Sequence, residues 1–287
     1  MRKLRYKSLN LGYLRKRMVI IMRYLINTLV VITIYLYFLK PSMRRKPVKH
    51  FLGVKFAHRG LHNYLTPENT LSSFSRAVND GFGIELDIHL TKDGEIVVFH
   101  DYDLLRACNV NKKISDLTYT QIKQYMIFDS DNSIPTFKEV LKLVSGKVPL
   151  LIEIKASNKI LGFRICRAVV KLLDNYNGSY CIESFNPLYL FWFRHNRPDI
   201  TRGQLMCKFP YRHKKRYFLF IFLLRSMLLN VLARPDFLAY DYKHKYLLSV
   251  RLCRLIFRTP MFAWTVPDEL LESDALRKYN SFIFEEE

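Results

Sequence analysis

Short runs of apolar residues alternate with longer segments of mixed polarity from Lys55 to the end of the chain. The runs are rich in β-branched and aromatic residues and are bounded by Gly, Pro, Asn or Asp, which is typical of buried strands. Most of the intervening segments have helical periodicity, so the pattern predicts an α/β fold with a parallel sheet. The predicted strands are 54–57, 83–88, 96–99, 150–154, 180–184, 203–206, 237–240, 261–265 and 282–284.

One of these nine runs differs from the others in how it is connected. Residues 96–99 follow the preceding strand after a short turn that contains Asp93 and Gly94. A parallel neighbour would need a crossover of about a dozen residues or more, so we expect 96–99 to be antiparallel to the strand before it. The other eight runs match the strand number of a closed TIM (β/α)8 barrel. A chain of 287 residues has room for one such domain and an additional segment.

The longest uncharged apolar run lies near the N-terminus. Residues 24–39 carry no charge, but sixteen helical residues span only about 24 Å of a hydrocarbon core of about 30 Å. A segment of about 18–39 has the required length and includes Arg23, whose guanidinium can reach the headgroups from near a helix end. Instead of a small-x-small cleavage site, Pro41 and a basic run follow, which argues against a cleaved signal peptide. We expect a retained membrane anchor in residues 1–50 and the barrel in residues 51–287.

Positive charge is concentrated in the same segment. The formal net charge is +21, and residues 1–50 contribute thirteen Lys and Arg with no Asp or Glu. These cations flank the apolar run at both ends, so the positive-inside rule leaves the side of the membrane open. Cations beside an apolar span match anionic headgroups, and the sequence has no nucleic-acid motif, so we expect membrane lipids and not nucleic acid as partners.

A second apolar segment, 217–232, follows a basic stretch at 211–216. Only eight uncharged residues precede Arg225, far too few to cross a bilayer. Two interpretations remain open. The segment is either a barrel helix with a wide buried face or a helix that lies in the membrane interface.

Two carboxylates stand two residues apart in the predicted strand 83–88. Glu85 and Asp87 project from the same face, because side chains alternate along a strand. Carboxylates in a shared space raise each other's pKa unless a cation lies between them, so a divalent metal is the simplest explanation. Glu153 and Lys155 place an acid and a base on one face of a later apolar strand.

Five motifs occur in order and resemble those of the glycerophosphodiester phosphodiesterase family, within the phospholipase-C-like TIM barrel superfamily. The resemblance covers roughly Lys55 to the C-terminus, and five ordered motifs are far more specific than one. It implies a TIM barrel with an inserted subdomain after the second strand, at about 88–147. The motifs are His58-Arg59-Gly60, Pro67-Glu68-Asn69-Thr70, Glu85-Leu86-Asp87, Asp93-Gly94 leading to Val97-Val98-Phe99-His100-Asp101, and Glu153-Ile154-Lys155.

The resemblance assigns the catalytic pair to His58 and His100, two imidazoles that titrate near neutral pH and can act as base and acid. The expected metal ligands are the hard carboxylate oxygens of Glu85, Asp87 and Glu153, which suit Mg²⁺ or Ca²⁺ and suit zinc poorly.

Further residues are expected to surround the substrate. Arg59 and Lys155 are predicted to bind the phosphate, with ion pairing to the acids as the alternative. Trp264 is expected to shape the alcohol pocket from a later strand end. His62 and His89 are interpreted as structural.

The sequence therefore predicts a membrane-anchored, metal-dependent hydrolase of lipid metabolism. It would cut glycerophosphodiesters or lysophospholipids to an alcohol and a phosphomonoester. One alternative is a phospholipase-type hydrolase that forms a cyclic phosphate. The other is an inactive membrane-bound binding module, against which the intact histidines and acids count. Family members usually continue past the last strand, so we expect its covering helix to be missing or supplied by another segment.

Overall fold

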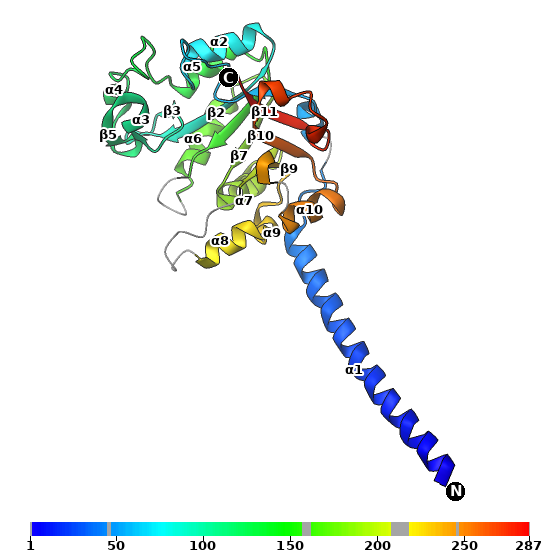
Figure 1. Ribbon diagram of the computed structural model, residues 1–287. Coiled ribbons are helices and arrows are strands. Elements are labelled where there is room, and N and C mark those ends of the chain that lie inside the picture. Colours follow the sequence, from blue (N-terminus) through cyan, green and yellow to red (C-terminus); the bar gives the residue numbers. More distant parts are fainter. Residues whose placement is uncertain (1, 45–46, 157–161, 208–217, 245–246, 287) are drawn as a thin grey trace.

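The computed structural model describes residues 2–44, 47–156, 162–207, 218–244 and 247–286, and it consists of one long helix and a barrel (Figure 1). Helix α1 (Arg2–Leu39) projects away from the barrel. Within it, Leu11–Leu39 is long and apolar enough to cross a membrane, and its apolar side chains are exposed along almost the whole length. The predicted anchor at about 18–39 lies inside this helix.

Eight parallel strands form a closed barrel, which confirms the predicted TIM barrel. Each strand pairs with the next along the chain, and the last, β11, pairs with β1 to close the ring. The strands are β1 (Lys55–Ala57), β2 (Gly83–Leu90), β6 (Leu150–Ile154), β7 (Tyr180–Ser184), β8 (Arg202–Met206), β9 (Phe237–Asp241), β10 (Met261–Pro267) and β11 (Ser281–Glu285). As predicted, β3 (Ile96–Val98) runs antiparallel to β2.

The outer layer consists of helices, and capping residues fix the start of several of them. Thr70 and Ser73 form a capping box at the start of α2, and Thr136 and Glu139 form one at the start of α5. Asn186 caps α7, whose first residue is Pro187. The helices of this layer are α2 (Leu71–Asn79), α5 (Phe137–Val144), α6 (Arg164–Leu173), α7 (Pro187–Asn196), α8 (Phe218–Arg225), α9 (Asn230–Ala233) and α10 (Leu248–Leu255).

An insertion between β2 and α5 has a small core of its own. That core includes Val97, Phe99, Ile114 and Ile134, which do not belong to the barrel core. Helix α5 lies within the predicted insertion range 88–147, yet it packs on the barrel and against α2. The short elements of the insertion are β4 (Asp103–Leu104), α3 (Leu105–Cys108), β5 (Val110–Lys113), η2 (Ile114–Asp116) and α4 (Tyr119–Ile122).

The interior of the barrel is filled by alternate residues of the strands. In β6, Leu151 packs inward, whereas its neighbours Leu150 and Ile152 pack outward against the helices. The rings of Phe237 and Phe262 stack with centroids 4.2 Å apart. Phe51, from the 3₁₀ helix η1 (Pro47–Phe51), joins the same interior cluster at the end where the strands begin. This packing leaves the carboxyl ends of the strands as the open mouth.

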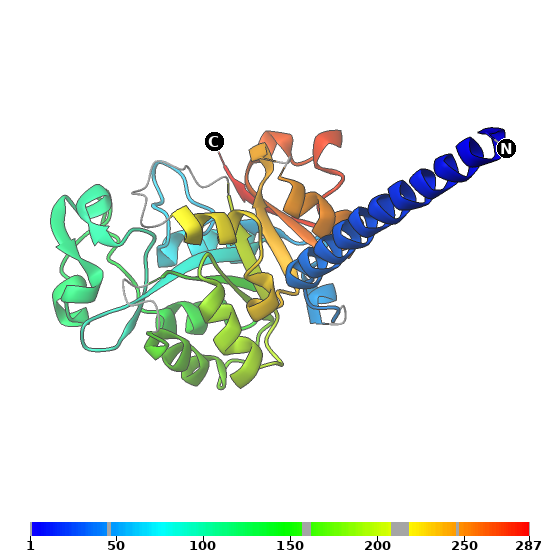
Figure 2. The same ribbon diagram turned by 90° about the horizontal axis from the view of Figure 1, so that it is seen from below.

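The last turn of α1 is packed against the barrel. Leu39 is fully buried in a cluster that includes Val250 and Cys253 of α10. The Asn230 side chain donates a hydrogen bond to the Leu39 carbonyl, and the Tyr35 hydroxyl donates one to the Ser226 carbonyl at 3.3 Å. Viewed from below, α8 and α10 lie on the side of the barrel from which α1 emerges (Figure 2). The last turn of the long helix is therefore attached to the barrel by packing and hydrogen bonds.

Candidate active site

Three carboxylates meet at the mouth of the barrel, as the sequence predicts. Glu85 and Asp87 lie two residues apart on β2, and Glu153 on β6 is paired in register with Asp87. One oxygen from each lies within 4.8 Å of the others, and all three side chains are buried. This is a group of hard oxygen ligands of the kind that Mg²⁺ and Ca²⁺ prefer.

The three acids differ in how easily they ionise. Burial, followed by repulsion from Asp87 and Glu153, raises the pKa of Glu85 well above its ordinary value. Burial likewise raises the pKa of Glu153, to about 7. Burial alone would raise the pKa of Asp87 as well. The positive charges of Lys155 and Arg59 outweigh this effect and hold the pKa of Asp87 well below its usual range. Such a crowded, buried set of acids fits a divalent cation, which would offset their repulsion.

The two expected phosphate-binding residues contact these acids. The Lys155 ammonium lies 2.7 Å from Asp87 Oδ1 and 2.9 Å from Glu153 Oε2. Arg59 Nε lies 3.5 Å from Asp87 Oδ2, and the backbone N–H of Arg59 donates to Glu85 at 2.9 Å. Arg59 has a φ of 54°, in the left-handed region that non-glycine residues rarely adopt. The ion pairing predicted as the alternative for Arg59 and Lys155 is thus present, at the edge of the metal-ligand group.

His100 lies at the end of a chain of ion pairs that crosses the mouth. His100 Nδ1 is 2.7 Å from Asp101 Oδ1, and Asp101 pairs with Arg106 at 2.6 Å. Glu68 then bridges Arg106 and Arg59. Burial lowers the pKa of His100, although the nearby Asp87 and Asp101 oppose this effect. The network holds the imidazole in place beside the acids.

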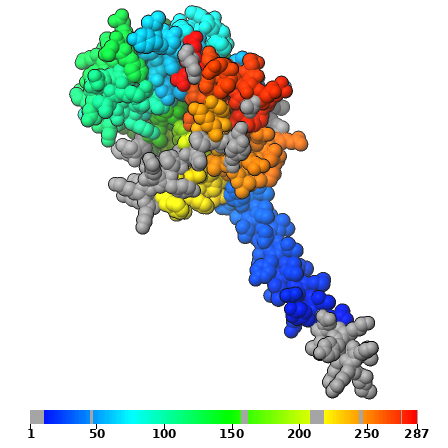
Figure 3. Space-filling model, viewed as in Figure 1, coloured from blue at the N-terminus to red at the C-terminus, as the bar shows by residue number. Residues whose placement is uncertain are grey.

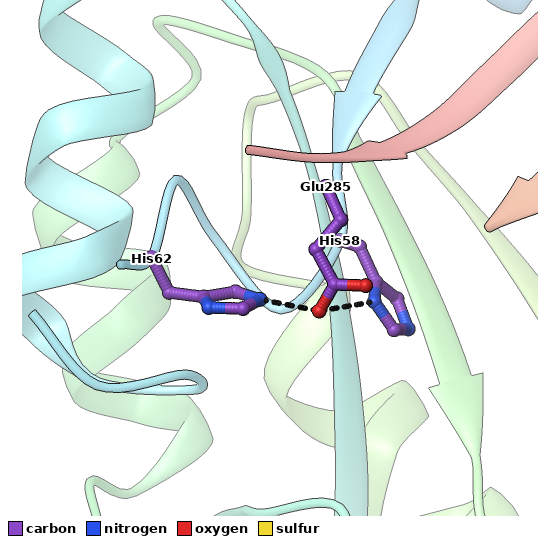
Figure 4. A group of neighbouring side chains, drawn as sticks. All are labelled: His58, His62 and Glu285. Atoms are coloured by element: carbon purple, nitrogen blue, oxygen red, sulfur yellow. Dashed lines mark ion pairs between the residues drawn. The ribbon is translucent and has the colours of Figure 1, made fainter. Parts of the chain in front are cut away.

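His58 has a different carboxylate beside it. His58 follows β1, and its Nδ1 lies 3.7 Å from an oxygen of Glu285 at the end of β11. The same oxygen is 3.0 Å from His62 Nε2, so the carboxylate lies between two imidazoles (Figure 4). Burial lowers the pKa of His58, whereas contacts with His58 and His62 hold the pKa of Glu285 well below its usual range.

A cavity of about 580 Å³ opens beside these residues. His100, Glu153 and Lys155 line it together with Tyr102 and Phe185. Trp264 does not line this cavity, but its ring packs edge-on against Phe185 with centroids 5.9 Å apart. A phosphodiester in the cavity would therefore reach an imidazole, an ammonium and the metal-ligand group at once.

The chain matches the model of a known protein family. The model of the glycerophosphoryl diester phosphodiesterase family matches residues 58–251, more than half of the chain. The chain belongs to this family. Human lysophospholipase D GDPD1 is 34% identical over 173 residues, which are 55% of this chain and 53% of the human protein. The match thus spans about half the length of that relative.

Solved structures of phosphodiesterases share the barrel fold of this chain. A glycerophosphodiester phosphodiesterase from Thermotoga maritima is 28% identical with a TM-score of 0.60, over 80% of this chain and 94% of that chain. A phosphodiesterase from Oleispira antarctica, in complex with the product sn-glycerol-3-phosphate, has a TM-score of 0.66 at 22% identity. That second match covers 81% of this chain and 93% of the other and shows the shared barrel.

Two acids in this family member were not predicted from the sequence. Glu285 contacts both His58 and His62, and His62 was interpreted as structural. Glu183 on β7 is paired in register with Glu153, is fully buried, and has one oxygen without a hydrogen-bond partner among the described residues. Glu285 is the last residue of β11 and Glu183 is the next-to-last residue of β7, at the strand ends where site residues of this fold gather. That position is the signal that would have identified them.

Proposed function

We propose that this protein is a membrane-anchored, divalent-metal-dependent phosphodiesterase that hydrolyses glycerophosphodiesters or lysophospholipids to an alcohol and a phosphomonoester. The observation that carries the proposal is the convergence of all five motifs on one end of the barrel. Three buried carboxylates, two imidazoles and two cations meet there beside a cavity. The family membership supports the same reaction class.

Seven of the predicted site residues have a chemical role in this reaction. When bound by Glu85, Asp87 and Glu153, a Mg²⁺ or Ca²⁺ ion would neutralise negative charge on the non-bridging phosphate oxygens. Arg59 and Lys155 add hydrogen-bond donors for the same oxygens. The three carboxylates would hold the metal ion, and the two cations would orient the anion.

His58 and His100 carry the protons. One imidazole takes the proton of the attacking hydroxyl, and the other donates a proton to the alkoxide that leaves phosphorus. The P–O bond to the alcohol breaks as the bond to the attacking oxygen forms. If water attacks, the first product is a phosphomonoester. If a neighbouring hydroxyl of the substrate attacks, the first product is a cyclic phosphate, and its detection would favour the phospholipase-type alternative.

The membrane part of the proposal rests on α1 and on the helices around its attachment. Helix α8 exposes Phe218, Leu219, Phe220 and Phe222, with between 44% and 65% of each residue accessible. Helix α10 exposes further aliphatic side chains, and these surfaces flank the base of α1 (Figure 3). Of the predicted interfacial segment 217–232, Tyr217 lies outside the described residues. We propose that α8 contacts the same bilayer as α1, which would favour lysophospholipid substrates.

Hydrolysis by the purified full chain tests the proposal. The substrates are glycerophosphocholine, glycerophosphoethanolamine, glycerophosphoglycerol and a lysophospholipid, each assayed with and without excess chelator. We expect hydrolysis that is abolished by chelation and restored by Mg²⁺ or Ca²⁺. Full activity of metal-stripped protein in chelator would remove the metal from the mechanism. No hydrolysis of any of the four would favour the binding-module alternative.

A further inference from the structure

A second cavity, of about 390 Å³, lies at the base of α1. Half of the ten residues that line it are cationic, and they come from three parts of the chain: the end of α1 and the segment after it, α7, and the region around β8 and β9. These cations are Lys40, Arg44, Arg194, Arg202 and Arg234.

One carboxylate faces this group of cations. Asp236 is fully buried and binds Arg44 through both of its oxygens, at 2.8 and 3.3 Å. The backbone N–H of Arg202 also donates to Asp236. The side-chain Nη1 of Arg202 lies 3.7 Å away from Asp236 and has no hydrogen-bond partner among the described residues, although the side chain is only 4% exposed. The cavity therefore has a large excess of positive charge and an unused buried donor.

Neutral carbonyl groups hold the other guanidinium groups in position. Arg194 donates to the carbonyls of Val231 and Leu232, both at 2.9 Å. Arg234 donates to the carbonyl of Tyr37 in the last turn of α1 and to that of Lys40, the residue after the helix. Carbonyl groups orient a guanidinium without cancelling its charge. Burial, together with repulsion from Arg44 and Arg194, lowers the pKa of Arg202 to about 10. An anion would relieve this repulsion.

The position of the cavity separates it from the catalytic mouth. Arg202 begins β8 and Asp236 immediately precedes β9, so the cavity lies at the opposite end of the strands from His100 and Lys155. It also lies directly beside the end of the candidate span, because Lys40 follows Leu39. If α1 crosses a bilayer, this is the level of the lipid headgroups.

We propose that this basic cavity is a phosphate-binding site at the membrane surface. Its ligand is the headgroup phosphate of an anionic phospholipid or, from the aqueous side, a free phosphate ion. Arginine forks match phosphate oxygens in geometry and charge, and basic pockets beside membrane helices suit anionic headgroups. The lipid source rests on the proposed membrane span of α1. Neither source depends on the proposed hydrolysis.

Lipid binding by the full chain in neutral detergent micelles tests the lipid source. Phosphatidylglycerol or phosphatidylcholine is titrated in, and bound lipid is counted by native mass spectrometry. The test variant is K40Q/R194Q, which keeps the Arg44–Asp236 pair. The matched control is R251Q/R254Q, which removes two exposed charges from α10 outside the cavity. We expect phosphatidylglycerol to bind the wild type and the control at least tenfold more tightly than K40Q/R194Q.

A second measurement tests free phosphate. Inorganic phosphate should raise the melting temperature of the wild type more than that of K40Q/R194Q, and phosphate bound at the catalytic mouth contributes equally to both. A difference in this measurement alone would assign the site to free phosphate. A difference with lipid would assign it to the headgroup. If K40Q/R194Q fails to fold, K40E changes a single exposed residue and should show the same losses.

Equal binding by wild type and cavity variants in both measurements would overturn the proposal. Flotation of the wild type with phosphatidylcholine vesicles tests the membrane anchor separately. A failure of the anchor is thereby distinguished from a failure of the phosphate site, and neither measurement requires turnover.

Discussion

The two histidines proposed to transfer protons differ in what surrounds them. His100 belongs to an ion-pair chain that continues to Glu68 and Arg59, whereas His58 shares the Glu285 carboxylate with His62. Both imidazoles lie near the metal-ligand group, and burial lowers the pKa of both. A lowered pKa favours the neutral imidazole, which suits the member of the pair that accepts a proton, whereas the other member must hold a proton to donate it.

Replacing either histidine by Ala should lower turnover far more than substrate binding. General acid-base assistance acts in the transition state and is commonly worth about 10²- to 10⁴-fold. The measurement is kcat and KM for H58A and H100A, with Mg²⁺ affinity as the control, which we expect to be unchanged. A variant with near wild-type kcat would exclude that histidine from proton transfer.

Removing the charge of Glu285 should reduce kcat without changing KM. We expect E285Q to lose roughly tenfold in kcat, because partners that orient functional groups contribute about this much or more. A merely structural role would lower the melting temperature and leave kcat of the folded enzyme unchanged. H62N, which leaves the contact of Glu285 with His58, is the matched control and should lose less.

The carboxylates also explain how far the sequence predicts the site. Glu85, Asp87 and Glu153 lie in motifs, and their alternation along strands places them on one face, so their convergence was predictable. Glu285 and Glu183 lie outside the five sequence motifs. Their role depends on which strands are neighbours in the closed barrel, and a local pattern does not contain that information. Glu285 reaches His58 only because β11 pairs with β1.

At the scale of elements, the strands were predictable because each is a short apolar run. All nine predicted runs match the observed strands to within two residues at each end, and β6 (Leu150–Ile154) matches without any difference. The predicted insertion, about 88–147, also includes α5, which is a helix of the barrel layer. The apolar face of α5, with Phe137 and Val144, looks the same in sequence whether it packs on the barrel or on the insertion. Tertiary contacts decide such a boundary.

Gly203 shows how tightly the barrel interior is packed. A Cβ at this position would lie 2.1 Å from the Phe237 ring, which itself stacks on Phe262. We expect G203A to lower the free energy of unfolding by about 1–3 kcal/mol, the usual cost of overpacking. Urea denaturation would measure it. F237L makes room for the added methyl group, so the double variant should lose less than the sum of the two single losses. Strict additivity would show that the clash is relieved elsewhere.

At the scale of the whole molecule, the N-terminal segment consists of two parts with different roles. Residues up to about 32 have exposed side chains where these are described, whereas Leu39, Val48 and Phe51 are buried in the barrel core. A deletion of residues 1–50 would therefore damage the fold. The test of anchoring is a deletion of residues 2–32, which keeps the packed turn of α1.

This shorter deletion should release the protein from membranes, at least in part. Hydrolysis of lysophospholipid in vesicles should then fall more than hydrolysis of soluble glycerophosphocholine, because the loss is one of local concentration and not of chemistry. Flotation and the two rates measure this. Combining F218S and F222S with the deletion should weaken any residual binding if α8 lies on the bilayer. Equal loss on both substrates would contradict a role for the anchor in substrate access.

The buried last turn of α1 joins helix and barrel through packing and hydrogen bonds. A spanning helix changes its tilt when the hydrocarbon thickness changes. Because Leu39 is hydrogen-bonded to Asn230 and packed against α10, a change in the tilt of the helix would tilt the barrel with it. The height of the catalytic mouth above the lipids would then follow bilayer thickness, so the proposed hydrolysis of lysophospholipid would differ between thin and thick membranes.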